Sequence, residues 1–171
     1  MTLDSRGRLW MIDDGREAGK PLEPGAAKVI RFDVDTGKTV GKAILKEPVL
    51  LPKSHMNDLR IDLTRGAQGT AFVTDSSFGT EPALITVDLA TGRARRLVAG
   101  TDLVAIDQKF MTFLEHQPHV YSQEKPTFPT GGADGITLSP DSSRLYWTAL
   151  TGRRLFIAPT AALSDSRLSE K

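Results

Sequence analysis

The chain of 171 residues has the composition of an ordinary globular domain, with 39% apolar residues, 25% charged residues and a net charge of +1. This balance gives no electrostatic reason to expect nucleic acid or a membrane surface as a partner, and no apolar run approaches the roughly 20 residues of a membrane helix. The absence of cysteine excludes disulfides and thiolate metal sites. Residues 1–5 lack the basic and apolar regions of a signal peptide.

Short apolar runs bounded by turn residues predict β-strands along most of the chain. In chain order, the expected strands are residues 9–12, 28–34, 40–45, 56–62, 70–75, 83–88, 94–98, 134–138, 145–148 and 154–158. Glycine-containing segments at 35–38 and 89–93 predict hairpin turns. Residues 160–163 predict one helical turn. The chain is therefore expected to be all-β.

The strand pattern repeats along the chain. Residues 9–12, 71–74 and 145–148 align as equivalent strands, each inside a unit of up to four short antiparallel strands. Repeats of this kind predict the blades of a β-propeller.

The expected blades cover about residues 1–48, 54–100 and 134–165, and the third lacks its outermost strand. Residues 101–133 form an insertion loop, with either a short helix or irregular chain over 101–113. A closed propeller needs roughly 4 to 8 blades. We therefore expect either missing blades in a longer protein or another chain to complete the ring.

Five motifs together resemble the Yellow and major royal jelly protein family, in a bacterial-type version. They lie at residues 9–16, 57–62, 72–76, 134–140 and 145–152. The resemblance implies a six-bladed propeller, of which this chain holds about three blades. It also implies an extracellular or periplasmic protein that binds a small organic ligand.

A more distant likeness is to calcium-dependent gluconolactonases, which are also propellers and hold a divalent ion with Asn and Asp at the inner ends of blade strands. Asn57 and Asp134 occupy such positions, which implies a Ca²⁺ site. The glutamate and the second asparagine of that pattern are not identifiable in this sequence.

Polar residues at strand ends are the candidate ligand-binding residues. They are Arg16, His55, Asn57, Asp58, Asp75, Ser76 and Asp134. Because the first strand of each blade lines the channel of a propeller, such groups are expected at one mouth. Arg16 can bind an anionic group, and His55 is a candidate base or ligand. The alternative is that these side chains hold turns and strand ends by bonding backbone N–H groups.

The sequence is compatible with three alternative functions. The first is binding of a small organic molecule at the channel mouth, with residues 110–133 as a lid. The second is hydrolysis of a lactone or similar ester by a metal-activated water. The third is a non-enzymatic interaction module. No Ser-His-Asp pattern, phosphate-binding loop or nucleotide fingerprint is present.

Overall fold

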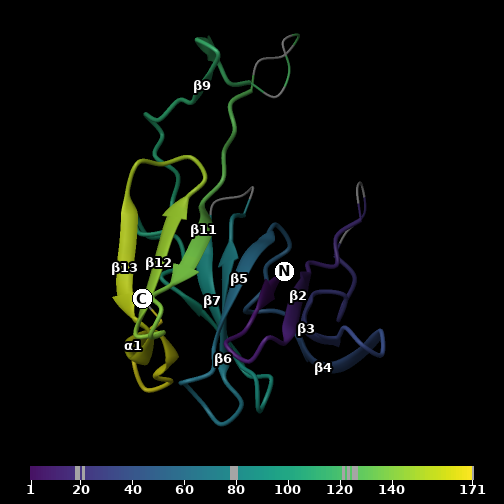
Figure 1. Cartoon of the computed structure of the whole chain (residues 1–171). Helices are drawn as coiled ribbons and strands as arrows, with labels where there is room; N and C mark the ends of the chain where they lie inside the picture. The colour runs from purple at the N-terminus through teal and green to yellow at the C-terminus, as the bar shows by residue number, and fades with distance from the viewer. Residues whose placement is uncertain are drawn as a thin grey trace.

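The computed structural model describes residues 1–17, 20, 22–77, 81–120, 122, 124 and 127–170. Within these residues the strands form two four-stranded sheets, one three-stranded sheet and one two-stranded hairpin, all antiparallel between neighbours. In the three larger sheets the strands follow one another in chain order. Figure 1 shows these three sheets side by side, with the hairpin standing away from them.

Sheet 1 consists of β1 (Thr2–Leu3), β2 (Leu9–Asp13), β3 (Lys28–Asp33) and β4 (Lys38–Ile44). Sheet 2 consists of β5 (Met56–Asp62), β6 (Thr70–Asp75), β7 (Ala83–Asp88) and β8 (Ala94–Leu97). Sheet 3 consists of β11 (Ala133–Leu138), β12 (Arg144–Ala149) and β13 (Leu155–Pro159). The hairpin is formed by β9 (Phe113–Leu114) and β10 (Gln117–Pro118), and a single helical turn, α1 (Thr160–Ser164), follows β13.

The predicted strands are present, with small shifts at their ends. Strand β3 ends at Asp33 rather than at Val34, because the Asp33 carboxylate accepts hydrogen bonds from the N–H groups of Asp35 and Thr36 and so begins the turn. Strand β4 begins at Lys38, two residues before the predicted start.

The insertion differs more from the sequence-based expectation. Residues 101–112 form turns and irregular chain, which is the second of the two expected alternatives, but the hairpin β9–β10 follows where a plain loop was expected. Its turn places Glu115 and His116 at φ values of 49° and 66°. Neither residue is the Gly, Asn or Asp that usually marks such a turn, so sequence alone gave no signal for it.

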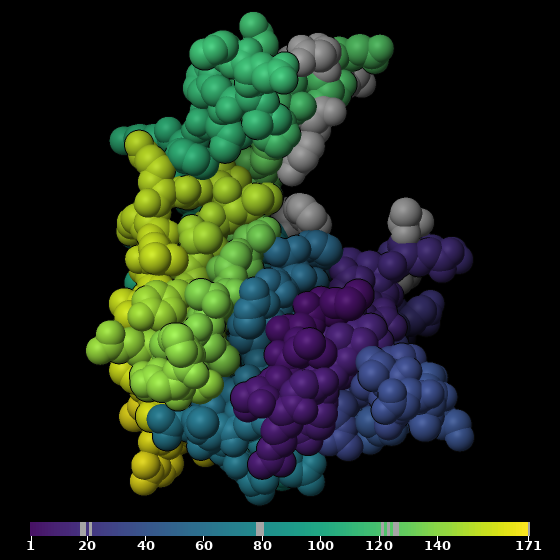
Figure 2. Space-filling model, in the orientation of Figure 1, coloured from purple at the N-terminus to yellow at the C-terminus, as the bar shows by residue number. Residues whose placement is uncertain are grey.

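Sheet 2 is buried on both faces because it lies between the other two sheets (Figure 2). Along β6, Ala71 and Val73 pack toward sheet 1, whereas Phe72 packs toward sheet 3. All six residues of β6 are buried. A strand covered on both faces needs apolar residues at successive positions, which explains why β6 and β7 read as continuous apolar runs.

The insertion rises from the end of the molecule at which β11 begins (Figure 1). We call the described residues between 107 and 130 the arm. Strand β5 lies beside both β1 and β11, so the first strands of the three sheets adjoin one another. No helix within the described residues is long and apolar enough to cross a membrane.

Candidate functional site

The first strands of sheets 2 and 3 are both irregular where they begin. The pairing of β5 with β6 shifts register between Met56 and Leu59, and the pairing of β11 with β12 shifts between Ala133 and Ile136. Bulges of this kind turn side chains out of the regular ladder and are common beside functional sites. They affect the segments that carry the predicted residues Asn57, Asp58 and Asp134.

Asp134 is the centre of this site. It is half-buried, and its carboxylate accepts hydrogen bonds from the side chain of Asn57 and from Ser76, whose Oγ lies 3.4 Å from Asp134 Oδ2. Burial raises the pKa of Asp134, and the nearby Asp58 carboxylate raises it further. The bonds from Ser76 and Asn57 and the proximity of His55 offset part of this rise in pKa.

Hydroxyl groups of β6 and of the residues that follow it hold Asp134 in place. Thr74 Oγ1 donates to the backbone oxygen of Asp134 at 2.7 Å, and Ser76 Oγ donates to that of Ala133 at 2.8 Å. Gly132 precedes the strand, and a Cβ atom there would collide with Pro82 and with the backbone oxygen of Val104. Thr74 was not predicted as a site residue. The signal that could have identified it is a threonine in a strand that is buried along its whole length, because a buried hydroxyl needs a hydrogen-bond partner.

His55 connects the site to sheet 1. Its Nδ1 atom lies 2.9 Å from Oδ2 of Asp14, which follows β2. Arg16 Nε and Nη2 donate to the backbone oxygens of Ser54 and Pro52 at 2.5 and 2.7 Å. Arg16 therefore stabilises the segment that leads into β5.

Asp75 lies beneath the site and has no exposed surface. Its Oδ1 atom accepts the N–H groups of His55 at 2.8 Å and Ser77 at 3.0 Å. Its Oδ2 atom accepts from Arg96 Nη1 at 2.6 Å and from the hydroxyl of Ser54. This buried ion pair holds together the segments before β5 and after β6, so Asp75 supports the site from the interior.

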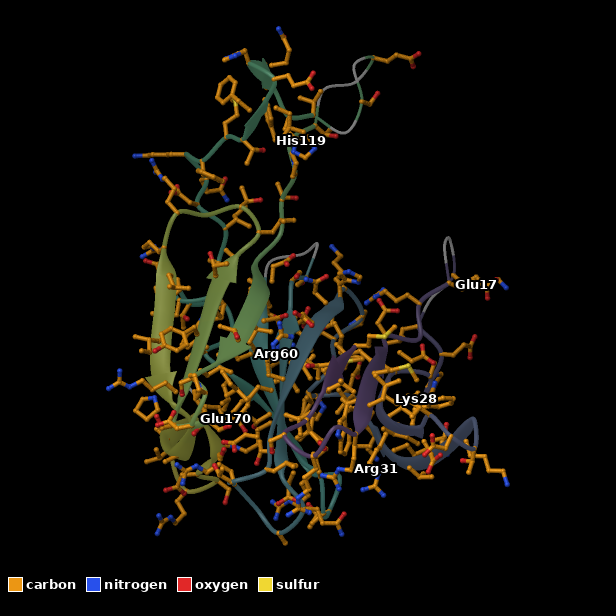
Figure 3. All side chains as sticks on the ribbon, in the orientation of Figure 1. Glu17, Lys28, Arg31, Arg60, His119 and Glu170 are labelled. Atoms are coloured by element: carbon orange, nitrogen blue, oxygen red, sulfur yellow. The ribbon has the colours of Figure 1, made fainter. Side chains whose placement is uncertain are left out.

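The structure thus gathers His55, Asn57, Asp58, Ser76 and Asp134 at one place. Asp58 Oδ2 also accepts from Arg60 Nη1 at 2.9 Å. Figure 3 shows Arg60 beside β5 and β11 near the middle of the molecule, and His119 in the arm above them.

Asn57 and Asp134 would supply only part of the donor set that the expected Ca²⁺ site requires. Carboxylate and amide oxygens, as in Asp134 and Asn57, are the donors that Ca²⁺ prefers, but it takes about 6 to 8 oxygen ligands. Among the described residues, no group of three or more His, Asp or Glu side chains is close enough to hold a metal ion.

Stacked antiparallel sheets whose first strands adjoin one another define a β-propeller architecture. Consistent with this, the sequence model of the major royal jelly protein family matches residues 1–171. The chain therefore belongs to that family, and its sheets are propeller blades. A search of curated proteins found no match.

The raised pKa of Asp134 predicts a pH-dependent effect on stability. Because the folded state binds the proton more tightly, the contribution of Asp134 to stability is complete below its unfolded pKa of about 4 and is lost as the pH rises through the higher folded pKa. Asp134→Asn removes the buried charge and keeps a hydrogen-bond acceptor. We expect its unfolding free energy to exceed that of the wild type at about pH 7 and the difference to disappear at about pH 3, measured by urea denaturation.

Asp141→Asn is the control of opposite sign. The Ser139 hydroxyl, with the N–H of Ser143, lowers the pKa of Asp141 to about 2. Its contribution is present above the unfolded pKa and is lost as the pH falls through the folded value. Asp141→Asn should therefore be the less stable protein at neutral pH. If the unfolding free energies of the two variants, each relative to the wild type, changed with pH in the same direction, Asp134 would not be a buried group that destabilises the fold when charged.

Proposed function

We propose that the chain binds a small organic molecule at the mouth formed by the beginnings of β5 and β11. The observation that carries this proposal is the convergence of Asn57, Ser76 and Asp134 from two sheets, at two strand bulges. Polar groups that converge on a half-buried carboxylate with a raised pKa are typical of binding sites.

The chemistry of the mouth favours a ligand that donates hydrogen bonds. Asp58 and Asp134 present carboxylate oxygens, and Asn57 adds an amide. A hydroxyl or cationic group of a ligand would offset the cost of holding Asp134 charged while partly buried. The arm rises at the same end of the molecule and would cover the ligand as a lid (Figure 1). We place this protein outside the cytoplasm, in an extracellular or periplasmic space, in keeping with its family.

An NMR screen of ¹⁵N-labelled protein with small polyols and amines tests this proposal. We expect bound compounds to shift the amide signals of Asn57, Ser76 and Asp134. Asp134→Ala should weaken their binding at least about tenfold, which corresponds to about 1.4 kcal/mol. Asp141→Ala, on a turn of sheet 3, should leave the affinity unchanged.

The outcome that contradicts the proposal is equally specific. A cavity of about 500 Å³ lies away from the mouth, between residues 22–25 and 45–52, with Leu22, Leu45 and Leu50 in its wall. If every bound compound shifted the signals of that cavity and left Asp134 unaffected, the ligand site would not be at the mouth.

Calcium-dependent hydrolysis of a lactone or similar ester is the second candidate, favoured by the neighbouring side chains of Asn57 and Asp134, whose amide and carboxylate oxygens are of the kind that Ca²⁺ prefers. A bound Ca²⁺ would lower the pKa of a water molecule and polarise the ester carbonyl. Calorimetric titration with CaCl₂ tests it. We expect Asp134→Asn to reduce the affinity for Ca²⁺ at least about tenfold. An unchanged affinity, or no heat of binding in the wild type, would eliminate this candidate.

A further inference from the structure

A polar cavity of about 220 Å³ lies at the end of the molecule opposite the arm, where β6 begins and α1 ends (Figure 1). Strands β6, β7 and β8 form one side of it, and the segment after α1 forms another. The side chains in its wall carry hydroxyl groups or charges, and include Thr70, Thr86, Asp88, Arg93, Arg95 and Ser164. None of these residues belongs to the proposed ligand site at the mouth.

The strand register explains why this part of the interior is polar. Phe72 packs toward sheet 3, and its partner in β7 is Thr86, which pairs in turn with Arg95 of β8. Two residues nearer the end of the sheet, Thr70 pairs with Asp88. Because paired and alternate residues share one face of a sheet, all of these side chains are turned toward sheet 3. The apolar packing between sheets 2 and 3 therefore gives way to polar groups where the cavity lies.

The equivalent position in sheet 1 carries a much longer side chain. Arg31 pairs with Trp10 as Thr86 pairs with Phe72. The guanidinium carbon of Arg31 lies 5.9 Å from the centre of the Trp10 ring, so this side chain extends over its neighbour. Thr86 is too short to extend over Phe72 in this way, which leaves room for the cavity beside sheet 2.

Two hydroxyl groups in the wall of the cavity have no hydrogen-bond partner among the described residues. Thr86 is only 5% exposed, and its side chain forms no hydrogen bond within this part of the chain. The Oγ atom of Ser164 is buried and likewise has no partner. Buried hydroxyls are nearly always hydrogen-bonded in folded proteins. Their presence in one cavity therefore indicates a polar molecule that binds there.

The charged groups of the cavity are held in fixed positions. Asp88 Oδ1 accepts the N–H groups of Ala90 and Thr91, both at 2.9 Å. Its Oδ2 atom accepts no hydrogen bond from the described residues, and it lies 3.8 Å from the point that a Cβ atom on Gly66, in the cavity wall, would occupy. Arg93 adds a guanidinium group to the same wall.

Arg95 holds the segment after α1 against sheet 2. Its Nη1 and Nη2 atoms donate to the backbone oxygens of Asp165 and Leu168 at 2.8 and 2.7 Å. Its Nε atom lies 3.3 Å from the carboxylate of Glu170, which Figure 3 shows beside α1. The far wall of the cavity is therefore fixed by three contacts of one side chain.

We propose that this cavity binds a small neutral compound with several hydroxyl groups, such as a short polyol or a monosaccharide. An anion would meet the carboxylate of Asp88, and a cation would meet the guanidinium of Arg93. A hydroxyl group both donates and accepts, so it can satisfy both residues as well as the hydroxyl of Thr86. The volume is below the roughly 300–1,000 Å³ of sites for drug-sized ligands, which limits the compound to a small one. This site goes beyond the proposed function and does not depend on it.

NMR titration of the ¹⁵N-labelled chain with glycerol, erythritol and D-glucose tests the proposal. We expect at least one of them to shift the amide signals of Thr70, Thr86 and Asp88 with saturation, at a Kd of about 10 mM or tighter. Shifts that rise without saturation, or that are confined to Asn57 and Asp134, would overturn it. The second of these results would at the same time support the proposed site at the mouth, so the two proposals can fail separately.

Two variants examine the roles of the lining groups. Thr86→Val removes the buried hydroxyl and keeps the side-chain shape, and should weaken binding about three- to tenfold. Asp88→Asn keeps an oxygen for the turn but replaces the other with an N–H donor, and should weaken binding by a similar factor. If Asp88→Asn fails to fold, Thr86→Val decides alone. Unchanged affinity in Thr86→Val would overturn the site.

The matched control is Asp33→Asn, because Asp33 Oδ1 accepts the N–H groups of Asp35 and Thr36 in the equivalent turn of sheet 1. Its affinity for the same compound should equal that of the wild type. Asp134→Ala, which alters the mouth, should also leave this binding unchanged. Equal weakening in Asp33→Asn and Asp88→Asn would show that the loss arises from the turn and would contradict a ligand contact at Asp88.

Discussion

Replacing Arg96 with methionine is expected to lower the free energy of unfolding by about 3–5 kcal/mol. The change leaves the carboxylate of Asp75 in the interior without its counter-charge. Arg96 Nη1 lies 2.6 Å from Asp75 Oδ2, and the two side chains are only 8% and 0% exposed. Urea denaturation of the purified variant at neutral pH measures the loss.

The size of this effect also depends on the backbone groups that Arg96 satisfies. Its guanidinium donates to the backbone oxygen of Val49 at 3.1 Å and to that of Glu81. A lysine has a single ammonium group and cannot reproduce the several hydrogen bonds that the planar guanidinium donates at once. The Arg96→Lys variant should therefore also be less stable than the wild type. The control is Arg167→Met, because Arg167 pairs with Asp165 at the surface, where ion pairs contribute less than about 1 kcal/mol. Equal losses in Arg96→Met and Arg167→Met would contradict a structural role for the buried pair.

The sequence predicted the fold well because its signals are local. Turn residues separate short apolar runs, and the equivalence of Trp10 with Phe72 follows from neighbouring residues alone. The grouping of Asn57 with Asp134 was also predictable, since both begin the first strand of a repeat. Their roles in binding remain predictions.

The ion pairs that hold the site from the interior and from sheet 1 could not be predicted from local sequence signals. Arg96 belongs to a run of basic residues that resembles an exposed turn, yet its side chain is buried against Asp75. The pairing of Asp14 with His55 joins a loop after β2 to the segment before β5. Such contacts depend on how loops from separate sheets meet, and no periodic pattern in the sequence encodes them.

Phe72→Ala is expected to lower the free energy of unfolding by about 3–5 kcal/mol. Phe72 lies within β6 and is fully buried with Leu84 and Trp147 in the cluster between sheets 2 and 3. Because sheet 2 is covered on both faces, neither water nor a neighbouring strand can readily fill the cavity. Urea denaturation at a single protein concentration avoids any change that arises from association.

Phe113→Ala provides a control with the same residue type, because Phe113 is 59% exposed in β9 and should change the unfolding free energy by no more than about 0.5 kcal/mol. Similar losses in the two variants would mean that the clusters between sheets do not dominate stability. The effect should also reach the site, since Phe72 shares its cluster with Ala133, the neighbour of Asp134. Hydrogen exchange should therefore show faster opening at the beginning of β11 in Phe72→Ala, while Phe113→Ala leaves that strand protected.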